Sequence, residues 1–241
     1  MKYKGLVCIF LISTYYFASG QSSMMSNYGG VVYKFSGIGV IYQKKFETDK
    51  NNGKQFEIEF ASFKHLKETK TFNSEIANST PFVFGKLNKT AILKTQYMIT
   101  KNISKFTDEQ RVGIDLIIGG GIAIGILKPV YLNMIYPDGG GFETVVSEKY
   151  NPQKHTDITR IAGYSDFRTG LGETTYKTGL TAMFGIGFTW GYFNNYPKRI
   201  ETGCFAEYFR KGLPVMAFTK NKPLQSGIYI KMLFGKRIFN K

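Results

Sequence analysis

One stretch of the chain, YKTGLTAMFGIGFTWGYFNN at 176–195, alternates between large apolar side chains and small or polar ones. Leu180, Phe184, Ile186 and Phe188 would share one face of an extended chain, and Gly, Thr and Lys fill most positions of the other. Alternation over so long a run predicts a β-strand with one apolar face. In a soluble sandwich that face packs against a second sheet, whereas in a membrane barrel it meets lipid.

The amino-terminal residues have the three parts of a secretory signal peptide. Two lysines precede an apolar run over residues 5–17, and the small residues Ala18, Ser19 and Gly20 follow. We expect cleavage after Gly20, which removes residues 1–20. An uncleaved anchor is disfavoured because the run is shorter than the ~20 residues of a membrane-spanning helix. The exported chain would keep one cysteine, Cys204, and therefore form no internal disulfide.

Composition points to β structure and to an anionic environment. Aromatic residues make up 16% of the chain, and the formal net charge is +15. An exported protein rarely meets nucleic acid, so we expect no nucleic-acid partner. Lipopolysaccharide, acidic lipid or an acidic protein would match this charge, and solvated basic loops are the alternative explanation.

The same alternation predicts eight strands in an all-β, closed, antiparallel transmembrane barrel. Gly119, Gly120 and Gly121 separate two of them, and we interpret the triplet as a hairpin turn because glycine readily adopts positive φ. One long strand with a glycine bend is the alternative, and ten strands would result if a hairpin lies near FVFGKLN. The predicted strands cover residues 37–46, 55–62, 91–99, 111–118, 122–134, 176–191, 199–210 and 226–236.

This strand set divides the mature chain into two parts. Residues 21–36 would be an N-terminal periplasmic segment, and residues 37–241 the outer-membrane barrel. Two connections are long, at 66–90 and 135–175. With both ends of the chain in the periplasm, the strand count places 66–90 on the periplasmic side and 135–175 outside. A connection as long as 66–90 is unusual for a periplasmic turn.

The two faces of the strands carry different side chains. The polar face has nearly balanced charges, as a narrow lumen requires, because an unpaired buried charge costs several kcal/mol. An eight-stranded barrel is just wide enough to be filled by its own side chains. We therefore predict a closed lumen with an ion-pair network of Glu57, Glu59, Lys94, Arg111, Asp115, Lys177, Glu201, Glu207 and Lys231.

The opposite face is predicted to meet lipid, with aromatic residues at the membrane interfaces. The expected lipid-facing residues are Phe56, Ile58, Phe60, Ile114, Leu116, Leu180, Phe184, Ile186, Phe188, Ile228, Ile230 and Phe234. The expected interfacial girdle comprises Tyr42, Tyr176, Trp190, Tyr192 and Tyr208.

Several short elements follow one another between residues 30 and 237: FASFKHLKETK, FVFGKLNKTAILKT, GGGIAIGILKPVYL, EKYNPQKHT, LPVMAF and a final FGKR. Together they resemble a family of uncharacterised outer-membrane β-barrel proteins from Bacteroidota, whose pattern has KHPKE-like, YGKLN-like and SGGxSLxxLKPVY-like elements. The chain departs from this pattern at Leu66, where the family has proline, and at 119–122. The resemblance implies an outer-membrane location and no particular activity, so no functional residue is transferred from it.

The sequence suggests no catalytic, cofactor-binding or metal-binding set. His65 and His155 both lie outside the predicted strands, which disfavours a barrel deacylase with a histidine on its lipid-facing wall. His155 with Glu148 and Asp157 could bind a metal ion, but a polar loop is the simpler interpretation.

We therefore predict a non-enzymatic integral outer-membrane protein that serves as a structural or accessory subunit of an envelope assembly. Its partners would be outer-membrane lipid and lipopolysaccharide, with a protein partner at 66–90 or 135–175. The alternatives are a lipid-A-binding or lipid-modifying barrel and a small diffusion channel.

Overall fold

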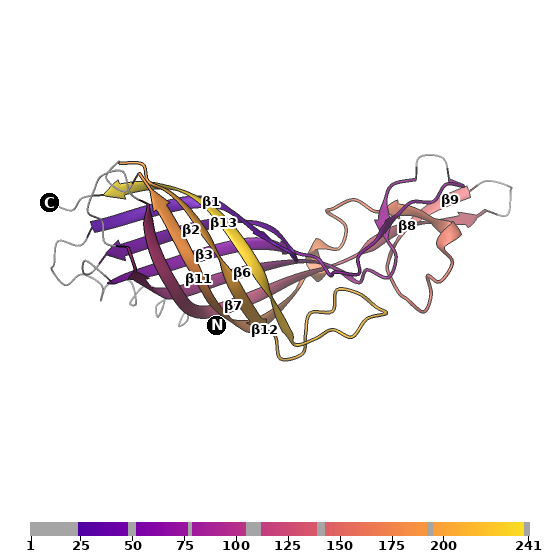
Figure 1. The fold of residues 1–241 in the computed structure, drawn as a ribbon. Coiled ribbons are helices and arrows are strands. Elements are labelled where there is room, and N and C mark those ends of the chain that lie inside the picture. Colours follow the sequence, from indigo (N-terminus) through magenta and orange to yellow (C-terminus); the bar gives the residue numbers. More distant parts are fainter. Residues whose placement is uncertain are drawn as a thin grey trace, which may run out of the picture.

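Eight antiparallel strands close into a barrel in the order β1–β13–β12–β11–β7–β6–β3–β2, which confirms the predicted eight-stranded antiparallel architecture. The computed structural model describes residues 24–47, 52–76, 79–104, 112–138, 143–191 and 195–238. Figure 1 shows tilted barrel strands and a smaller β structure that projects from one end. The barrel strands are β1 (Met24–Lys34), β2 (Gly37–Glu47), β3 (Asn52–Phe63), β6 (Asn88–Asn102), β7 (Gly113–Pro129), β11 (Thr175–Trp190), β12 (Lys198–Tyr208) and β13 (Leu224–Ile238).

The first strand, β1, was not predicted. Residues 24–34 lie in the barrel wall and not in a separate periplasmic segment, because β1 pairs with both β2 and β13 along its length. Val31, for example, lies between Val40 and Met232. The alternation of β1 is interrupted by two consecutive glycines, and a side chain at Gly30 would collide with the backbone of β13. Gly30 thus permits a close strand pairing, and the two glycines together hide the period of the strand in the sequence.

The predicted hairpin at Gly119–Gly121 is wrong, and the alternative of one long strand is correct. Strand β7 runs through the triplet for 17 residues. Gly120 pairs with Tyr97 on one side and Ala182 on the other. None of the three glycines has the positive φ that a tight turn needs. Their lack of side chains instead brings the neighbouring strand close, since a Cβ on Gly121 would stand 1.9 Å from the carbonyl oxygen of Thr95.

The missed strand β1 and the wrong hairpin at Gly119–Gly121 offset each other, so the predicted number of strands is correct. The predicted ends at which the connections emerge are not. The connections 64–87, 130–174 and 209–223 all leave one end of the barrel, which we call the extension end. Strand β13 finishes at the opposite end, which we call the terminal end. The connection predicted at 66–90 therefore emerges beside the one predicted at 135–175, at the same end of the barrel. With this correction, the long connection at 66–90 no longer has to be interpreted as a periplasmic turn.

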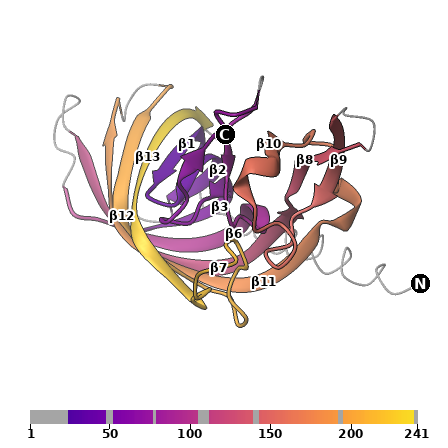
Figure 2. The same cartoon turned by 90° about the vertical axis from the view of Figure 1, so that its right-hand side faces the viewer.

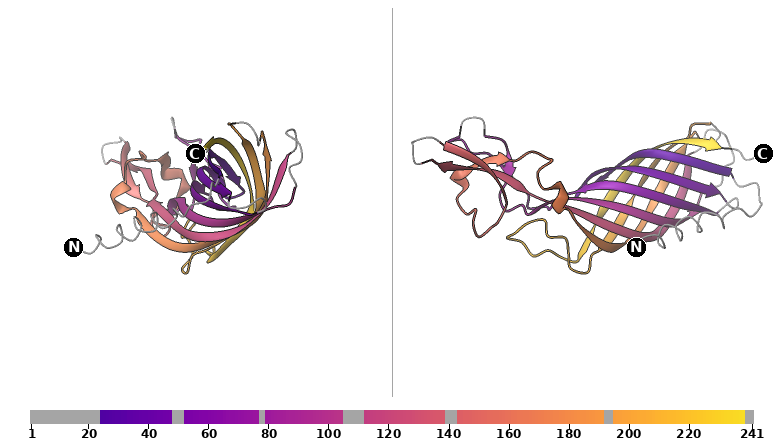
Figure 3. Two further views of the ribbon diagram at one scale, coloured as in Figure 1. Left: turned by 90° about the vertical axis from the view of Figure 1, so that its left-hand side faces the viewer. Right: turned by 180° about the vertical axis from the view of Figure 1, so that it is seen from behind.

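Residues 64–87 and 130–174 build the projecting part, which we call the extension (Figures 2 and 3). It contains a three-stranded sheet in the order β10–β8–β9 and the short pair β4–β5. No helix in the described ranges is long and apolar enough to cross a membrane. The elements are β4 (Lys70–Thr71), β5 (Phe82–Val83), β8 (Tyr131–Pro137), β9 (Glu143–Lys149), β10 (Ile161–Tyr164) and two short 3-10 helices, η1 (Ile158–Arg160) and η2 (Leu171–Glu173).

The extension has an apolar core of its own. Buried side chains from β5, β8, β10 and the segments beside them form this core, and Phe84, Leu87 and Tyr164 pack against it. Strand β7 ends at Pro129 and β8 begins at Tyr131, so the barrel strand continues almost directly into the extension sheet. The core comprises Phe82, Val130, Leu132, Met134, Tyr150 and Ile161.

Candidate functional site

The inward faces of the strands bring charged side chains together inside the barrel. Toward the extension end, Nζ of Lys94 lies 2.9 Å from a carboxylate oxygen of Glu59 and 2.9 Å from one of Glu207. Lys34 pairs with Glu59 as well, and its Nζ lies 3.4 Å from Oε1 of Glu207. The Phe205 ring lies beside this group, with its centroid 4.7 Å from Nζ of Lys34. Two cations and two carboxylates thus neutralise one another in a buried cluster.

A second cluster toward the terminal end is centred on Arg199. Its Nη1 lies 2.5 Å from Oδ2 of Asp115, and its Nε lies 2.7 Å from Oε1 of Glu201. Nζ of Lys45 lies 2.8 Å from the same Asp115 oxygen. Nη1 of Arg199 also donates to the Thr189 hydroxyl at 2.6 Å. Charge-assisted hydrogen bonds of this kind fix both the position and the orientation of the guanidinium.

Lys231 connects the two clusters near the middle of the barrel. Its Nζ lies 2.7 Å from Oε2 of Glu57 and 3.6 Å from Oε2 of Glu201. Neutral amides add hydrogen bonds of 3.0 Å to one oxygen of each carboxylate. Gln96 donates to Glu57, and Gln43 and Gln55 donate to Glu201.

Within the described residues, five buried carboxylates and five buried cations form the connected centre of this lumen network, and their formal charges cancel. Glu47, 3.7 Å from Nζ of Lys45, and the buried Arg237 add one charge of each sign toward the terminal end. Such a network fills the lumen and leaves little room for water, as expected for a barrel of eight strands. The members of its centre are Lys34, Lys45, Glu57, Glu59, Lys94, Asp115, Arg199, Glu201, Glu207 and Lys231.

Seven of the nine residues predicted for the lumen belong to this network. Lys177 does not, because its Nζ donates to the backbone carbonyl of Gly212 at 2.8 Å. Arg111 lies outside the described residues. Three cations were missed: Lys34 lies on the unpredicted β1, whereas Lys45 and Arg199 lie on predicted strands. Arg199 could have been found, since it is two residues from Glu201 and so faces the same way.

Glycines on β11 provide the space that the largest lumen side chains occupy. A Cβ built on Gly187 would stand 2.2 Å from Nη2 of Arg199, and one on Gly185 would stand 2.2 Å from the Tyr229 hydroxyl oxygen. The small residues of the alternating stretch at 176–195 therefore match bulky partners on β12 and β13.

The outward face of the barrel is apolar. The residues predicted to meet lipid alternate with buried ones and point away from the lumen. Ile58, Phe60, Leu180, Phe184, Ile228, Ile230 and Phe234 are exposed, whereas Phe56, Ile114, Leu116, Ile186 and Phe188 are partly covered by their neighbours.

The aromatic residues predicted for the girdle occupy different heights. Tyr176 and Tyr208 lie at the extension end of their strands, and Trp190 ends β11 at the terminal end. Tyr42 was misplaced, because it lies at the middle of the 11-residue β2 and pairs there with Gly29 and Ile58. Tyr192 lies outside the described residues.

The elements that carried the family resemblance meet where the barrel joins the extension. Leu87 donates its backbone N–H to Val215 at 2.8 Å, and Ala217 donates to Gly85 at 2.8 Å, so FGKLN and LPVMAF lie side by side. Asn88 Nδ2 donates to the Pro214 carbonyl at 2.7 Å. Lys86, from the same element, forms an ion pair with Glu68 of FKHLKETK.

This junction also closes the lumen at the extension end. Phe209 and Leu213 lie over the glycines at 125 and 179, where they form part of a buried apolar cluster with Val215. Apolar side chains therefore cover the lumen network on this side.

His155 has a structural role in the extension. His155 is buried against Tyr150, and its Nε2 lies 3.1 Å from Oε2 of Glu148. Asp157 instead caps η1 by accepting from the Thr159 N–H at 3.0 Å. In the described ranges no three His, Cys, Asp or Glu side chains are arranged to hold a metal ion.

Two ionisable groups in the extension have shifted pKa values. Hydrogen bonds from Lys154 and then His155 lower the pKa of Glu148 to about 2. Burial raises the pKa of Tyr164 to about 12, and its hydroxyl accepts from the Val83 N–H at 2.9 Å. Both groups hold segments of the extension together.

No family model matches the sequence, and no curated protein matches it. Among solved structures, the chain is similar to Ail, the attachment invasion locus protein of Yersinia pestis, crystallised with the heparin analogue sucrose octasulfate. That match has 12% identity, a TM-score of 0.38, and covers 90% of this chain and 97% of Ail. Neisserial surface protein A matches with 9% identity and a TM-score of 0.36, over 90% of this chain and 96% of that protein.

Proposed function

We propose that this chain is an integral outer-membrane barrel that is closed to solutes and serves as a structural or accessory subunit of an envelope assembly. The observation that carries the proposal is the pairing of a neutral, buried lumen network with an apolar outer face. A soluble sandwich would place its apolar residues inside and its charges outside, which is the reverse of this arrangement.

The lengths of the connections support one orientation in the membrane. Outer-membrane barrels have short periplasmic turns and longer extracellular loops. The three longest connections leave the extension end, so the extension faces outward and the terminal end faces the periplasm. The agreement of several sequence elements supports membership of the Bacteroidota barrel family.

Membrane insertion is tested by extraction and gel migration. We expect the protein to stay in the membrane fraction through a carbonate wash and to migrate differently in boiled and unboiled samples. Release by carbonate together with identical migration would contradict insertion. A steady open current in planar bilayers would contradict the closed lumen and favour the diffusion channel, whereas we expect no current.

A protein partner is proposed at the extension, through the edge strand β9. In the three-stranded sheet, β9 pairs with β8 on one side only, and Val145 and Val146 are exposed. An exposed apolar edge strand is a template for pairing with another chain, and proteins normally protect such edges.

This partner role is tested by isolating the full chain from native membranes in mild detergent. We expect a stoichiometric partner that is lost when Val145 and Val146 are both changed to lysine. Leu171→Lys, a similar change at another exposed position of the extension, is the control and should retain the partner. A monomer with the unmodified chain would contradict the subunit role.

A further inference from the structure

The rim of the barrel has a notch at the extension end, above the hairpin that joins β1 and β2. Strand β1 ends at Lys34, where it pairs with Tyr229 of β13. Strand β13 extends five residues further to Leu224, and along this stretch it pairs with β12. On the other side, the Lys64 N–H donates to the Ser36 carbonyl at 2.6 Å, and the chain then rises into the extension. The wall is therefore lower at the turn than on either side of it.

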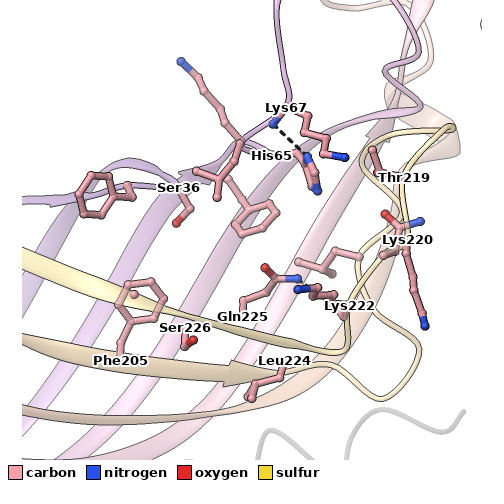
Figure 4. Close-up of a pocket in the computed structure, with 17 residues that line it drawn as sticks. Ser36, His65, Lys67, Phe205, Thr219, Lys220, Lys222, Leu224, Gln225 and Ser226 are labelled. Atoms are coloured by element: carbon pink, nitrogen blue, oxygen red, sulfur yellow. Dashed lines mark hydrogen bonds between the residues drawn. The ribbon is translucent and has the colours of Figure 1, made fainter.

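A pocket of about 500 Å³ occupies this notch. Figure 4 shows His65 and Lys67 on one side and Thr219, Lys220 and Lys222 on the other. Phe205 lines its inner part, beside the lumen network. The pocket is thus a recess at the extension-end mouth of the barrel, and Phe205 lies between it and Lys34 of the lumen network.

The ionisable residues that line the pocket are all basic. Four lysines and His65 surround it, and no carboxylate is among the described lining residues. The acidic residue nearest in the sequence, Glu68, pairs with Lys86. Glu68 also accepts from the His65 N–H at 3.0 Å, so one carboxylate stands beside four lining lysines and Lys86. Cations in such excess attract an anion, and lysine is a common phosphate ligand. The lysines are Lys64, Lys67, Lys220 and Lys222.

Other lining groups indicate what accompanies the anion. Oγ1 of Thr219 and Oδ1 of Asn221 are buried, and neither has a hydrogen-bond partner among the described residues. Buried polar atoms without partners are uncommon. These two have almost no exposed surface, so the polar side chains open to a ligand are those of Ser36, Gln225 and Ser226. Phe35, Leu66 and Leu224 line the same pocket with 67%, 84% and 54% of their surface exposed. Such apolar side chains at the rim suit hydrocarbon chains.

We propose that the notch binds a phosphorylated glycolipid of the outer leaflet. The four lysines bind its phosphate, Ser36, Gln225 and Ser226 bind sugar hydroxyls, and the acyl chains lie along Phe35 and Leu224. This assignment rests on the proposed membrane insertion and orientation, and it adds a specific lipid site at the rim. A free phosphate ion would satisfy the lysines alone and would leave the apolar side chains without a role.

The test is a titration of the full chain in detergent, followed by native mass spectrometry. The probes are diphosphorylated lipid A, the same lipid after dephosphorylation, and inorganic phosphate. We expect binding of the phosphorylated lipid. The dephosphorylated form should bind at least roughly tenfold more weakly, because it loses the charge-assisted hydrogen bonds to the lysines. Equal binding of the two lipids would overturn the proposal. Displacement of the lipid by millimolar phosphate would show a site for the free anion and would also overturn it.

Matched variants locate the site. Replacing Lys64, Lys67, Lys220 and Lys222 with alanine should weaken binding at least tenfold. A control that replaces four exposed lysines elsewhere lowers the net charge equally and should leave binding unchanged, whereas equal loss in both variants would mean nonspecific attraction.

Binding is scored only for variants that retain heat-modifiable migration. Failure of heat modification in the unmodified chain would count against membrane insertion, and absent binding by a heat-modifiable barrel would count against the lipid site alone. The control lysines are Lys70, Lys101, Lys198 and Lys236.

Discussion

The guanidinium of Arg199 occupies the space that any side chain at position 187 would fill. A Cβ on Gly187 would stand 2.2 Å from Nη2 and 2.6 Å from the central guanidinium carbon. The two residues lie on neighbouring strands, and from this position Arg199 reaches both Asp115 and Glu201. The glycine is therefore a requirement of the charge network and not only of the strand.

Gly187→Val is expected to displace Arg199 and to destabilise the folded barrel by roughly 3–5 kcal/mol, as breaking a buried ion pair does. The free energy of unfolding would be measured by urea titration in lipid vesicles, followed through the fluorescence of Trp190, the only tryptophan in the chain. Gly29→Ala is the control, because a Cβ there has no atom within 4 Å. A Gly187→Val barrel as stable as the unmodified one would contradict the close packing of Arg199 against this glycine.

Lys231 and Glu57 are expected to show strong energetic coupling. Lys231→Met alone leaves a buried carboxylate without its cation and should cost roughly 3–5 kcal/mol, and adding Glu57→Gln should recover part of this loss. A double-mutant cycle in the same unfolding assay measures the coupling. The exposed pair Lys149–Glu173, at 2.6 Å, is the comparison and should couple by no more than about 1 kcal/mol. Equal coupling in both pairs would argue against a dry lumen.

A cysteine pair tests whether β1 closes the barrel. Val31 and Met232 are directly opposite on β1 and β13, and facing residues of antiparallel strands lie about 4.5–5.5 Å apart, within reach of a disulfide. In a Cys204→Ser background, Val31→Cys with Met232→Cys should form a disulfide on mild oxidation, seen as a shift in nonreducing gels. Val31→Cys with Leu180→Cys should not. A periplasmic β1 would leave both pairs reduced.

Acid is expected to loosen the extension through Glu148. Its pKa is lowered in the folded protein from 4.5 to about 2, so its hydrogen bonds with Lys154 and His155 stabilise the extension above about pH 4.5. That stabilisation is lost as the pH falls toward 2. Amide hydrogen exchange over residues 143–155, corrected for intrinsic rates, should show falling protection across this range. Glu148→Gln should remove this contribution to the pH dependence of protection. If protection in this variant falls with pH as in the unmodified chain, other groups cause the pH dependence.

The sequence was informative where side chains alternate regularly. The faces of β11 and β12 could be predicted because a two-residue period separates Leu180 from Thr181 and Glu201 from Ile200. Glycine was the main source of error, since it marks turns and close strand contacts alike. At Gly119–Gly121 and at Gly29–Gly30 the choice depends on the neighbouring strands, which no local pattern records.

The binding notch could not be predicted for a different reason. Lys64 and Lys222 are far apart in the sequence, and each looks like an ordinary surface residue. Only the different lengths of β1 and β13 bring their segments to one recess. The side of the membrane assigned to 66–90 depended on the same missed strand.

The lumen network also bears on how the barrel is completed. Lys34 of β1 pairs with Glu207 of β12, Lys45 of β2 with Asp115 of β7, and Lys231 of β13 with Glu57 of β3. Each pair joins strands that are not neighbours in the chain. Before β1 pairs with β13 the barrel would be open, so these charges would be solvated and would favour no particular strand alignment. A misaligned closure would leave several of them desolvated without partners, which is energetically costly. The network would therefore favour the correct pairing of the first strand with the last.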